Sequence, residues 1–190
     1  MTVRRAADLS GQALADLREA TWTRLYDAAF LRGEFVLSSG RTSRYYIDKY
    51  LFETQPDLLR DVARLLAHAL PPDTARLAGP ALGGIPLATA VSLETGIPFV
   101  IVRPEAKEHG TARTIEGRLE RGDRVVVLED VVTTGGQAVR AAQVVEAAGG
   151  RVALVLAVVD RSEGGREGVE GAGYRFESLY DLRTRSTAAS

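Results

Sequence analysis

The sequence contains no cysteine, which excludes disulfide bonds and metal sites built on thiolates. It has only two histidines, His68 and His109, too few for a histidine-rich metal centre. Neither sign of charge prevails, because 24 Lys and Arg residues stand against 25 Asp and Glu residues, for a net charge of −1. A balanced charge of this kind attracts neither nucleic acid nor an acidic membrane surface, so any anion site must be local.

Long apolar runs are also missing. No stretch approaches the roughly 18 apolar residues expected of a transmembrane helix. Near the start, Arg4 and Arg5 are followed by Asp8 and Gly11 instead of the apolar region of a signal peptide. We therefore expect no membrane or nucleic-acid partner and a cytoplasmic location. With 190 residues, 45% of them hydrophobic, the chain is expected to form a single domain over 1–190.

Helices and strands are predicted to alternate along the chain. A helix at 12–31, stopped by Gly33, is followed by a hairpin with strands at 35–37 and 45–48. The later elements, in order, are a helix at 56–70, a strand at 76–79, a helix from about 85 to 96, strands at 98–103 and 124–130, a helix at 136–150, and strands at 151–161 and 174–182. This alternation predicts an α/β fold with a mostly parallel central sheet flanked by helices. The helix and hairpin, approximately 12–50, would form a small hood over a core at approximately 56–182.

The most informative segment is VVVLEDVVTTGGQAVRAA at 125–142. Glu129 and Asp130 follow a run that is typical of a strand buried on both faces, and ligands of open α/β sheets bind beyond such strand ends. The turn at 133–136 precedes a predicted helix, and a glycine-rich turn at a helix N-terminus directs backbone N–H groups at an anion. The acids suit hydroxyl groups, or a magnesium ion bridged through water. The segment therefore predicts a site for a phosphorylated, hydroxyl-bearing ligand.

Two common phosphate motifs are excluded by the spacing. A Walker loop needs a lysine after its glycines, and a dinucleotide site needs G-x-G-x-x-G directly after the strand; neither is present. The alternative is a plain glycine turn with solvated acids at a strand end. Two acids placed directly after a buried strand serve no packing purpose, which favours a ligand site.

The segment closely resembles the phosphoribosyl pyrophosphate (PRPP) motif of type I phosphoribosyltransferases: four apolar residues, two acids, two apolar residues, Thr, a small residue and Gly. The resemblance implies a type I phosphoribosyltransferase-like fold, with Glu129 and Asp130 contacting the ribose hydroxyls as catalytic residues. It also implies that the turn holds the 5′-phosphate. The PRPP-binding residues implied for this segment are Glu129, Asp130, Val131, Val132, Thr133, Thr134, Gly135, Gly136 and Gln137.

The segment RPEAKEHG at 103–110 is similar to the mobile loop of orotate phosphoribosyltransferases, with the pattern Arg-Lys-x-x-Lys-x-His-Gly. Arg103, Lys107 and His109 match this pattern and are implied to bind PRPP. Lys107 and His109 are further implied to be catalytic, by neutralising the leaving pyrophosphate. Pro104 stands where the family usually has a lysine.

Two more segments resemble the same family. FVLSSGRTSRYYID at 35–48 is similar to its hairpin, in which we expect Tyr45 and Tyr46 to pack within the hood. GPALGGIP at 79–86 is similar to its pyrophosphate-side loop, although Gly83 stands where some members carry a lysine.

The segment DRSEGG at 160–165 resembles the family segment whose arginine grips the orotate carboxylate. This implies that Arg161 binds orotate, and Thr133 could also reach the pyrimidine. The implied reaction joins orotate to the phosphoribosyl group of PRPP, giving orotidine 5′-monophosphate and pyrophosphate in pyrimidine biosynthesis. The implied cofactor is Mg²⁺, held mainly through PRPP and water with no direct protein ligand. The resembling enzymes are homodimers in which the loop of one subunit reaches the other's active site.

Two alternatives stay open at this point. The first is a phosphoribosyltransferase for another base, such as a purine, which would have no use for Arg161 as a carboxylate clamp. The second is a non-catalytic regulator that senses PRPP, which the departures at Pro104 and Gly83 keep open. Arg32 and Lys49 are left without an assigned role.

Overall fold

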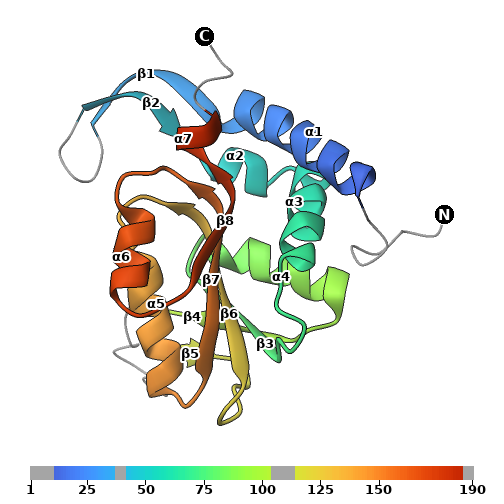
Figure 1. Ribbon diagram of the computed structural model, residues 1–190, viewed down its shortest axis with the longest axis vertical. Helices are drawn as coiled ribbons and strands as arrows, with labels where there is room; N and C mark the ends of the chain where they lie inside the picture. The colour runs from blue at the N-terminus through green and yellow to red at the C-terminus, as the bar shows by residue number, and fades with distance from the viewer. Residues whose placement is uncertain (1–10, 37–41, 104–113, 186–190) are drawn as a thin grey trace.

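The structure, a computed structural model, describes residues 11–36, 42–103 and 114–185 (Figure 1). The strands are β1 (Phe30–Val36), β2 (Thr42–Ile47), β3 (Arg76–Pro80), β4 (Phe99–Val102), β5 (Ile115–Glu116), β6 (Arg124–Val132), β7 (Arg151–Asp160) and β8 (Phe176–Asp181). The helices are α1 (Gln12–Ala29), α2 (Tyr50–Glu53), α3 (Pro56–His68), α4 (Gly84–Thr95), α5 (Gly136–Ala147), α6 (Gly165–Gly171) and α7 (Leu182–Arg185). None of these helices is long and apolar enough to cross a lipid bilayer.

A six-stranded sheet with the order β5-β4-β3-β6-β7-β8 forms the centre of the protein. All neighbouring strands in it run parallel except β5, which pairs antiparallel with β4 at one edge. Helices α3 and α4 cover one face, and α5 and α6 cover the other (Figure 1). The predicted α/β fold with a mostly parallel sheet is therefore confirmed.

Strand β6 lies in the middle of the sheet and contributes to both halves of the core. Val126 and Leu128 pack into the cluster on the α3 and α4 side, whereas Val125 and Val127 pack into the cluster on the α5 side. Because successive side chains of a strand alternate between faces, a strand buried on both sides must be apolar at every position. This burial explains the unbroken apolar run before the acids.

The strand order reverses between β3 and β6. The chain leaves β3 through α4 towards β4, and it leaves β6 through α5 towards β7 on the other side. Since α4 and α5 cover opposite faces, the carboxyl ends of these two neighbouring strands border a crevice. Such a switch point is the usual ligand site of an open α/β sheet.

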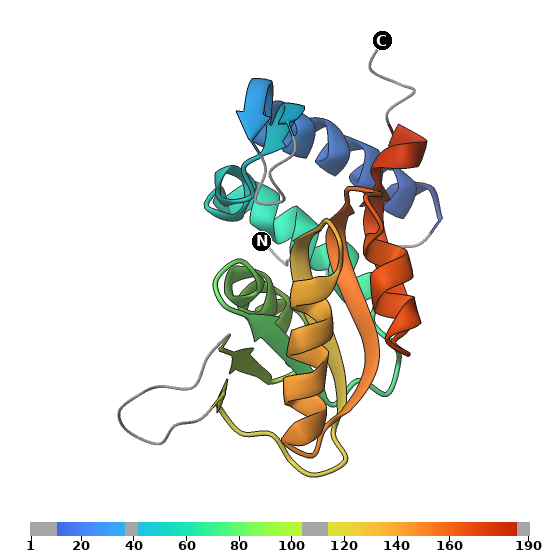
Figure 2. The ribbon, with the colours of Figure 1, turned by 90° about the vertical axis from the view of Figure 1, so that its left-hand side faces the viewer.

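The predicted hood is present and consists of α1, the hairpin β1–β2 and the short helix α2. Figure 2 shows it above one end of the central sheet. The hairpin is a separate two-stranded sheet. Trp22 of α1 packs on Tyr180 at the end of β8, with ring centroids 5.0 Å apart, and the Tyr180 hydroxyl donates a 2.9 Å hydrogen bond to the Arg18 carbonyl.

Several element boundaries differ from the sequence prediction. The first helix ends at Ala29, and β1 already begins at Phe30, which pairs with Ile47 across the hairpin. Gly33, expected as a helix stop, lies inside β1 between Arg32 and Phe35, where the strand register shifts. Cross-strand pairing overrides the helical spacing there, as tertiary contacts commonly override local propensity.

Two further differences concern the sheet and the short elements. Strand β6 was predicted to end at residue 130, but it continues to Val132, because Val131 and Val132 keep pairing with β7. The elements α2, β5, α6 and α7 were not predicted. Each has only two to seven residues, too few to show a helical or alternating period.

Candidate active site

Two acids lie at the carboxyl end of β6, and both are 3% exposed. Being consecutive in a strand, Glu129 and Asp130 point to opposite faces of the sheet. The charge that acts on Glu129 from the α5 side is that of Arg140. Asp130 faces the α4 side, where the Lys49 Nζ atom lies 2.6 Å from its Oδ2 atom in an ion pair. The sequence alone assigns no role to Lys49.

Helix α2 brings a third carboxylate, Glu53, to the same place. Glu53 is 3% exposed, and neither of its carboxylate oxygens has a hydrogen-bond partner. A Cβ atom on Gly83 would lie 1.6 Å from Asp130 Oδ2 and 3.0 Å from Glu53 Oε1. The loop before α4 therefore packs its backbone directly against both acids.

Sequence reasoning missed Glu53, although a signal was available. Lys49 and Glu53 are four residues apart, so one turn of helix places them on the same face. The prediction did not include a helix there, and Glu53 was therefore not considered together with Lys49.

Burial changes the pKa values of the ionisable groups around Asp130. Burial, helped by the negative charge of Asp130, raises the pKa of Glu53 to about 8 and that of Glu129 to about 8. Burial by itself lowers the pKa of Lys49, but the attraction of Asp130 outweighs it and leaves that pKa raised. Near neutral pH these raised pKa values favour the protonated form of both glutamates, whereas the ion pair joins Lys49 to Asp130.

The predicted phosphate turn follows β6 and ends in Gly135, whose φ of 81° lies in the left-handed region. Helix α5 begins at the next residue and has no side-chain capping hydrogen bond, so its first N–H groups are free for an anion. Helix α4, after β3, also has no side-chain cap. Two helix N-termini without side-chain caps therefore lie at the ends of the two strands that border the crevice.

The turn is held from behind by neighbouring segments. A Cβ atom on Gly135 would lie 2.8 Å from the Gly165 carbonyl oxygen, because α6 packs closely against the turn. The Val132 carbonyl accepts a 2.9 Å hydrogen bond from the Arg161 backbone N–H. The Val132 side chain is buried in the core, so this residue can take part in PRPP binding only through its backbone.

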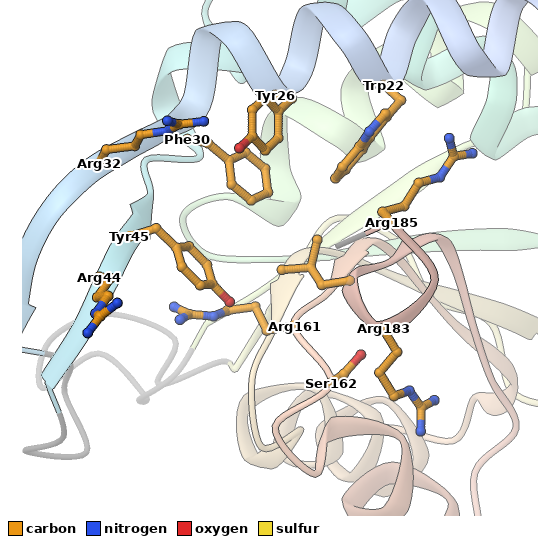
Figure 3. A pocket seen from close by; sticks show the side chains of 11 residues that line it. Trp22, Tyr26, Phe30, Arg32, Arg44, Tyr45, Arg161, Ser162, Arg183 and Arg185 are labelled. Carbon is orange, nitrogen blue, oxygen red and sulfur yellow. The ribbon is translucent and has the colours of Figure 1, made fainter. Parts of the chain in front are cut away.

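A cavity of about 600 Å³ lies between the hood and the ends of β7 and β8 (Figure 3). Its walls include the aromatic rings of Trp22, Tyr26, Phe30 and Tyr45, together with the guanidinium of Arg161. An aromatic pocket with a convergent cation suits a flat, anionic ring. The sequence predicts that Tyr45 packs within the hood. It does stack on Phe30, with centroids 6.0 Å apart, and it also lines this cavity.

Arg161 is 8% exposed and reaches into the cavity from the loop after β7 (Figure 3). Its Nη2 atom lies 2.8 Å from Glu163 Oε1, and its guanidinium lies over the Tyr45 ring, 5.1 Å from the centroid. Its Nε atom is buried and has no hydrogen-bond partner. A buried N–H group without a partner is costly, so this edge of the guanidinium is suited to a ligand carboxylate.

Arg103 lies at the carboxyl end of β4, on the same edge of the sheet as the crevice. Its Nη1 atom is 3.6 Å from Glu116 Oε1, and it lines a second hollow of about 250 Å³ together with Gln137 of α5. This hollow brings Arg103 close to the N-terminus of α5. Lys107 and His109 lie outside the described residues, so their predicted roles stay predictions.

Comparison with known proteins agrees with this geometry. The family model "Phosphoribosyl transferase domain" matches residues 52–172. Orotate phosphoribosyltransferase of Halobacterium salinarum is 53% identical over 147 residues, which cover 77% of this chain and 83% of that protein.

Solved structures agree as well. Orotate phosphoribosyltransferase of Mycobacterium tuberculosis superposes with a TM-score of 0.79 at 35% identity, covering 88% of this chain and 97% of that one. A crystal structure of the same enzyme in complex with PRPP gives a TM-score of 0.75 at 32% identity, with the same coverage. The chain therefore belongs to the phosphoribosyltransferase family, and within it to the orotate phosphoribosyltransferases.

Proposed function

We propose that this protein transfers the 5-phosphoribosyl group of PRPP to orotate, giving orotidine 5′-monophosphate and pyrophosphate. The surroundings of Arg161 are the observation that favours orotate as the base. Arg161 is a buried cation with an unpartnered N–H, in an aromatic cavity, and orotate is a flat pyrimidine that bears a carboxylate. A purine without a carboxylate would leave this guanidinium edge unpaired, at a desolvation cost.

The crevice supports the PRPP half of the proposal. The uncapped N-terminus of α5 and the turn before it would bind the 5′-phosphate, since the helix dipole and free N–H groups favour an anion there. Glu129 and Asp130 would contact the ribose hydroxyls. Arg103, with Lys107 and His109, would neutralise the pyrophosphate as it leaves.

The proposed cofactor is Mg²⁺, which would supply charge neutralisation to the pyrophosphate. Among residues 11–36, 42–103 and 114–185, no group of three or more His, Cys, Asp or Glu side chains could hold a metal ion. The acids present can still accept hydrogen bonds from metal-bound water. We propose, as the family resemblance implies, that the ion is held mainly by PRPP and water, with no direct protein ligand.

The residues would act by positioning and charge. In the proposed step the bond from ribose C1 to pyrophosphate breaks while a bond to the orotate nitrogen forms. That nitrogen gives up its proton, which the departing pyrophosphate or solvent water accepts. Positive charge develops on the ribose and negative charge on the pyrophosphate. Fixed hydrogen-bonding groups that hold the two substrates in line and stabilise these charges can account for most of such a rate enhancement.

The test is a direct assay. The protein is mixed with orotate, PRPP and Mg²⁺, and the loss of orotate absorbance is followed, with adenine, hypoxanthine and uracil in parallel. We expect turnover with orotate and little with the other bases. Turnover with a purine in place of orotate would contradict the proposal, and binding of PRPP without any turnover would favour a regulator. A cytoplasmic location and a homodimer with shared active sites belong to the same proposal.

A further inference from the structure

The Lys49–Asp130 pair differs from the other ion pairs near the crevice in its surroundings. Asp130 retains 4% of its side-chain exposure and Lys49 27%, and the Glu53 carboxylate lies beside Asp130 against the same Gly83 backbone. The carboxyl groups of Asp130 and Glu53 thus lie together on the α4 side, whereas Glu129 lies on the opposite face of the sheet. In the part of the chain that the structure describes, Lys49 is the cation that is ion-paired with Asp130.

Gly83, at the start of α4, brings no side chain to the Asp130 carboxylate. A Cβ at this position would overlap Asp130 Oδ2 at 1.6 Å. A longer side chain there, such as the lysine of some relatives, would require the Asp130 carboxylate to move. Lys49 approaches the same oxygen from the hairpin foot, the segment 48–49 that follows β2, and its Nζ atom lies 2.6 Å from Asp130 Oδ2.

The position of Lys49 is itself well defined. It precedes α2, and its carbonyl accepts hydrogen bonds from the backbone N–H groups of Phe52 and Glu53. The Asp48 backbone N–H donates a 2.9 Å hydrogen bond to the Ala29 carbonyl, which fixes the end of the hairpin to the end of α1. The Lys49 side chain therefore extends from a short segment whose backbone is fixed by hydrogen bonds.

We propose that Lys49 is a positioning residue of the PRPP site, which acts by holding the Asp130 carboxylate in place for the ribose hydroxyls. This inference rests on the proposed function, in which Asp130 contacts the ribose. Without Lys49, the buried Asp130 carboxylate would lie beside Glu53 with no cation paired to it among the described residues. Its Oδ1 atom would keep the hydrogen bond from the Val131 backbone N–H, but its Oδ2 atom would lose the contact that holds it, so the carboxylate could rotate away from the ribose.

A double-mutant cycle tests the inference. Lys49→Met, Asp130→Asn and the double variant are compared with the wild type for kcat and for KM of PRPP and orotate. Lys49→Met should lower kcat/KM for PRPP by about 10- to 100-fold, the range of coupling between paired charged groups, and leave KM for orotate nearly unchanged. The double variant should be no worse than Asp130→Asn alone, because Lys49 acts through Asp130.

Two further variants serve as controls. Lys49→Arg keeps a cation and should recover most of the lost rate. Arg124→Met removes a cation at the opposite end of β6, where Arg124 Nε lies 2.8 Å from Asp73 Oδ2, and it should leave the kinetics unchanged. Thermal unfolding reports whether each variant folds, and Lys49→Gln replaces Lys49→Met if that variant does not fold.

The outcomes separate the possibilities. If the effects of Lys49→Met and Asp130→Asn multiply, Lys49 acts independently of Asp130 and the inference is wrong. If Lys49→Met raises KM for PRPP, and KM for pyrophosphate in the reverse reaction, without changing kcat, then Lys49 binds phosphate directly. That result would also overturn the inference. Calorimetric titration of PRPP with Mg²⁺ allows the cycle to be measured without orotate. A protein that fails to convert orotate therefore disproves the proposed function without deciding the role of Lys49.

Discussion

At the scale of single residues, Arg161 combines burial, an ion pair and an unpartnered N–H group. Its Nη2 is held by Glu163 and its guanidinium face by Tyr45, which leaves Nε for a ligand. The contacts fix the guanidinium before a substrate arrives, so little side-chain entropy would be lost on binding.

Replacing Arg161 should affect one substrate only. We expect Arg161→Ala to weaken orotate binding by roughly 2–5 kcal/mol, as for truncation of one partner of a buried charge pair, and to leave PRPP affinity nearly intact. Calorimetry with each substrate measures both. Arg183→Ala is the control, because Arg183 also lines the cavity but is exposed and paired with Asp181. Equal loss of both affinities would indicate misfolding or a different orotate site.

The raised pKa of Glu53 predicts a pH dependence of stability. Its pKa is about 8 in the folded protein and close to 4.5 in an unfolded chain. Between these values the folded state binds more protons than the unfolded state, so the free energy of unfolding must decrease as pH rises. Glu53→Gln cannot ionise, and its free energy of unfolding should decrease less steeply across this window.

Urea unfolding of both proteins across the window measures the two slopes. Glu129 has a similarly raised pKa and stays in the variant, so a residual slope is expected. Glu167→Gln, at an exposed position on α6, should retain the wild-type slope. Parallel curves for the wild type and Glu53→Gln would show that Glu53 ionises normally in the folded protein.

At the scale of elements, the turn between β6 and α5 is shaped by two separate requirements at Gly135. The φ angle of Gly135 is positive, and a Cβ atom on this residue would lie only 2.8 Å from the Gly165 carbonyl oxygen. Gly164, which precedes α6, has a φ of 93° but nothing within 4 Å of its Cβ position. The two glycines therefore allow backbone strain to be separated from close packing.

Alanine at each glycine makes that separation measurable. Gly164→Ala should cost about 1–2 kcal/mol of stability for the left-handed backbone alone. Gly135→Ala should cost about 2–4 kcal/mol, because the α6 backbone must also move away, and it should raise KM for PRPP. Chemical unfolding and steady-state kinetics give both quantities. Equal losses of stability would show that α6 can yield without cost.

The sequence predicts the alternating core of this fold well, and the hood less well. β6 and β7 have apolar runs that only a doubly buried strand explains, and the acids after position 128 indicated a ligand site. The predicted hairpin start at residue 35 was wrong, because the observed start at Phe30 depends on pairing with Ile47, a residue 17 positions away. Glu53 was missed because the short helix α2 was not predicted; its spacing from Lys49 was a signal, but its position beside Asp130 arises only in the folded chain.

At the scale of the whole molecule, the proposed site draws on segments distant in the sequence. Four segments meet at the carboxyl ends of the central strands: the hairpin foot, the loop before α4, the end of β6 and the loop after β7. The loop that carries Lys107 and His109 is proposed to come from a second subunit, which makes the assembly part of the site.

Subunit mixing tests that proposal. Lys107→Ala and Asp130→Asn should each be nearly inactive when prepared alone. If the loop serves the partner's site, a hybrid dimer has one site with both lesions and one with neither. Random exchange makes half of the dimers hybrid, so activity should return to about a quarter of the wild-type value. Mass spectrometry verifies that exchange has taken place; activity that stays at the level of the single variants would place the loop in its own subunit's site.

The separation of the hairpin from the central sheet has a consequence for local motion. β6 and β7 are each hydrogen-bonded on both sides, whereas β1 and β2 pair only with each other. In native-state hydrogen exchange, amides of β6 and β7 should therefore be protected up to the global unfolding free energy, and those of the hairpin much less. The cavity under the hood can then open on the timescale of hairpin fluctuations while the carboxylates at the end of β6 keep their places.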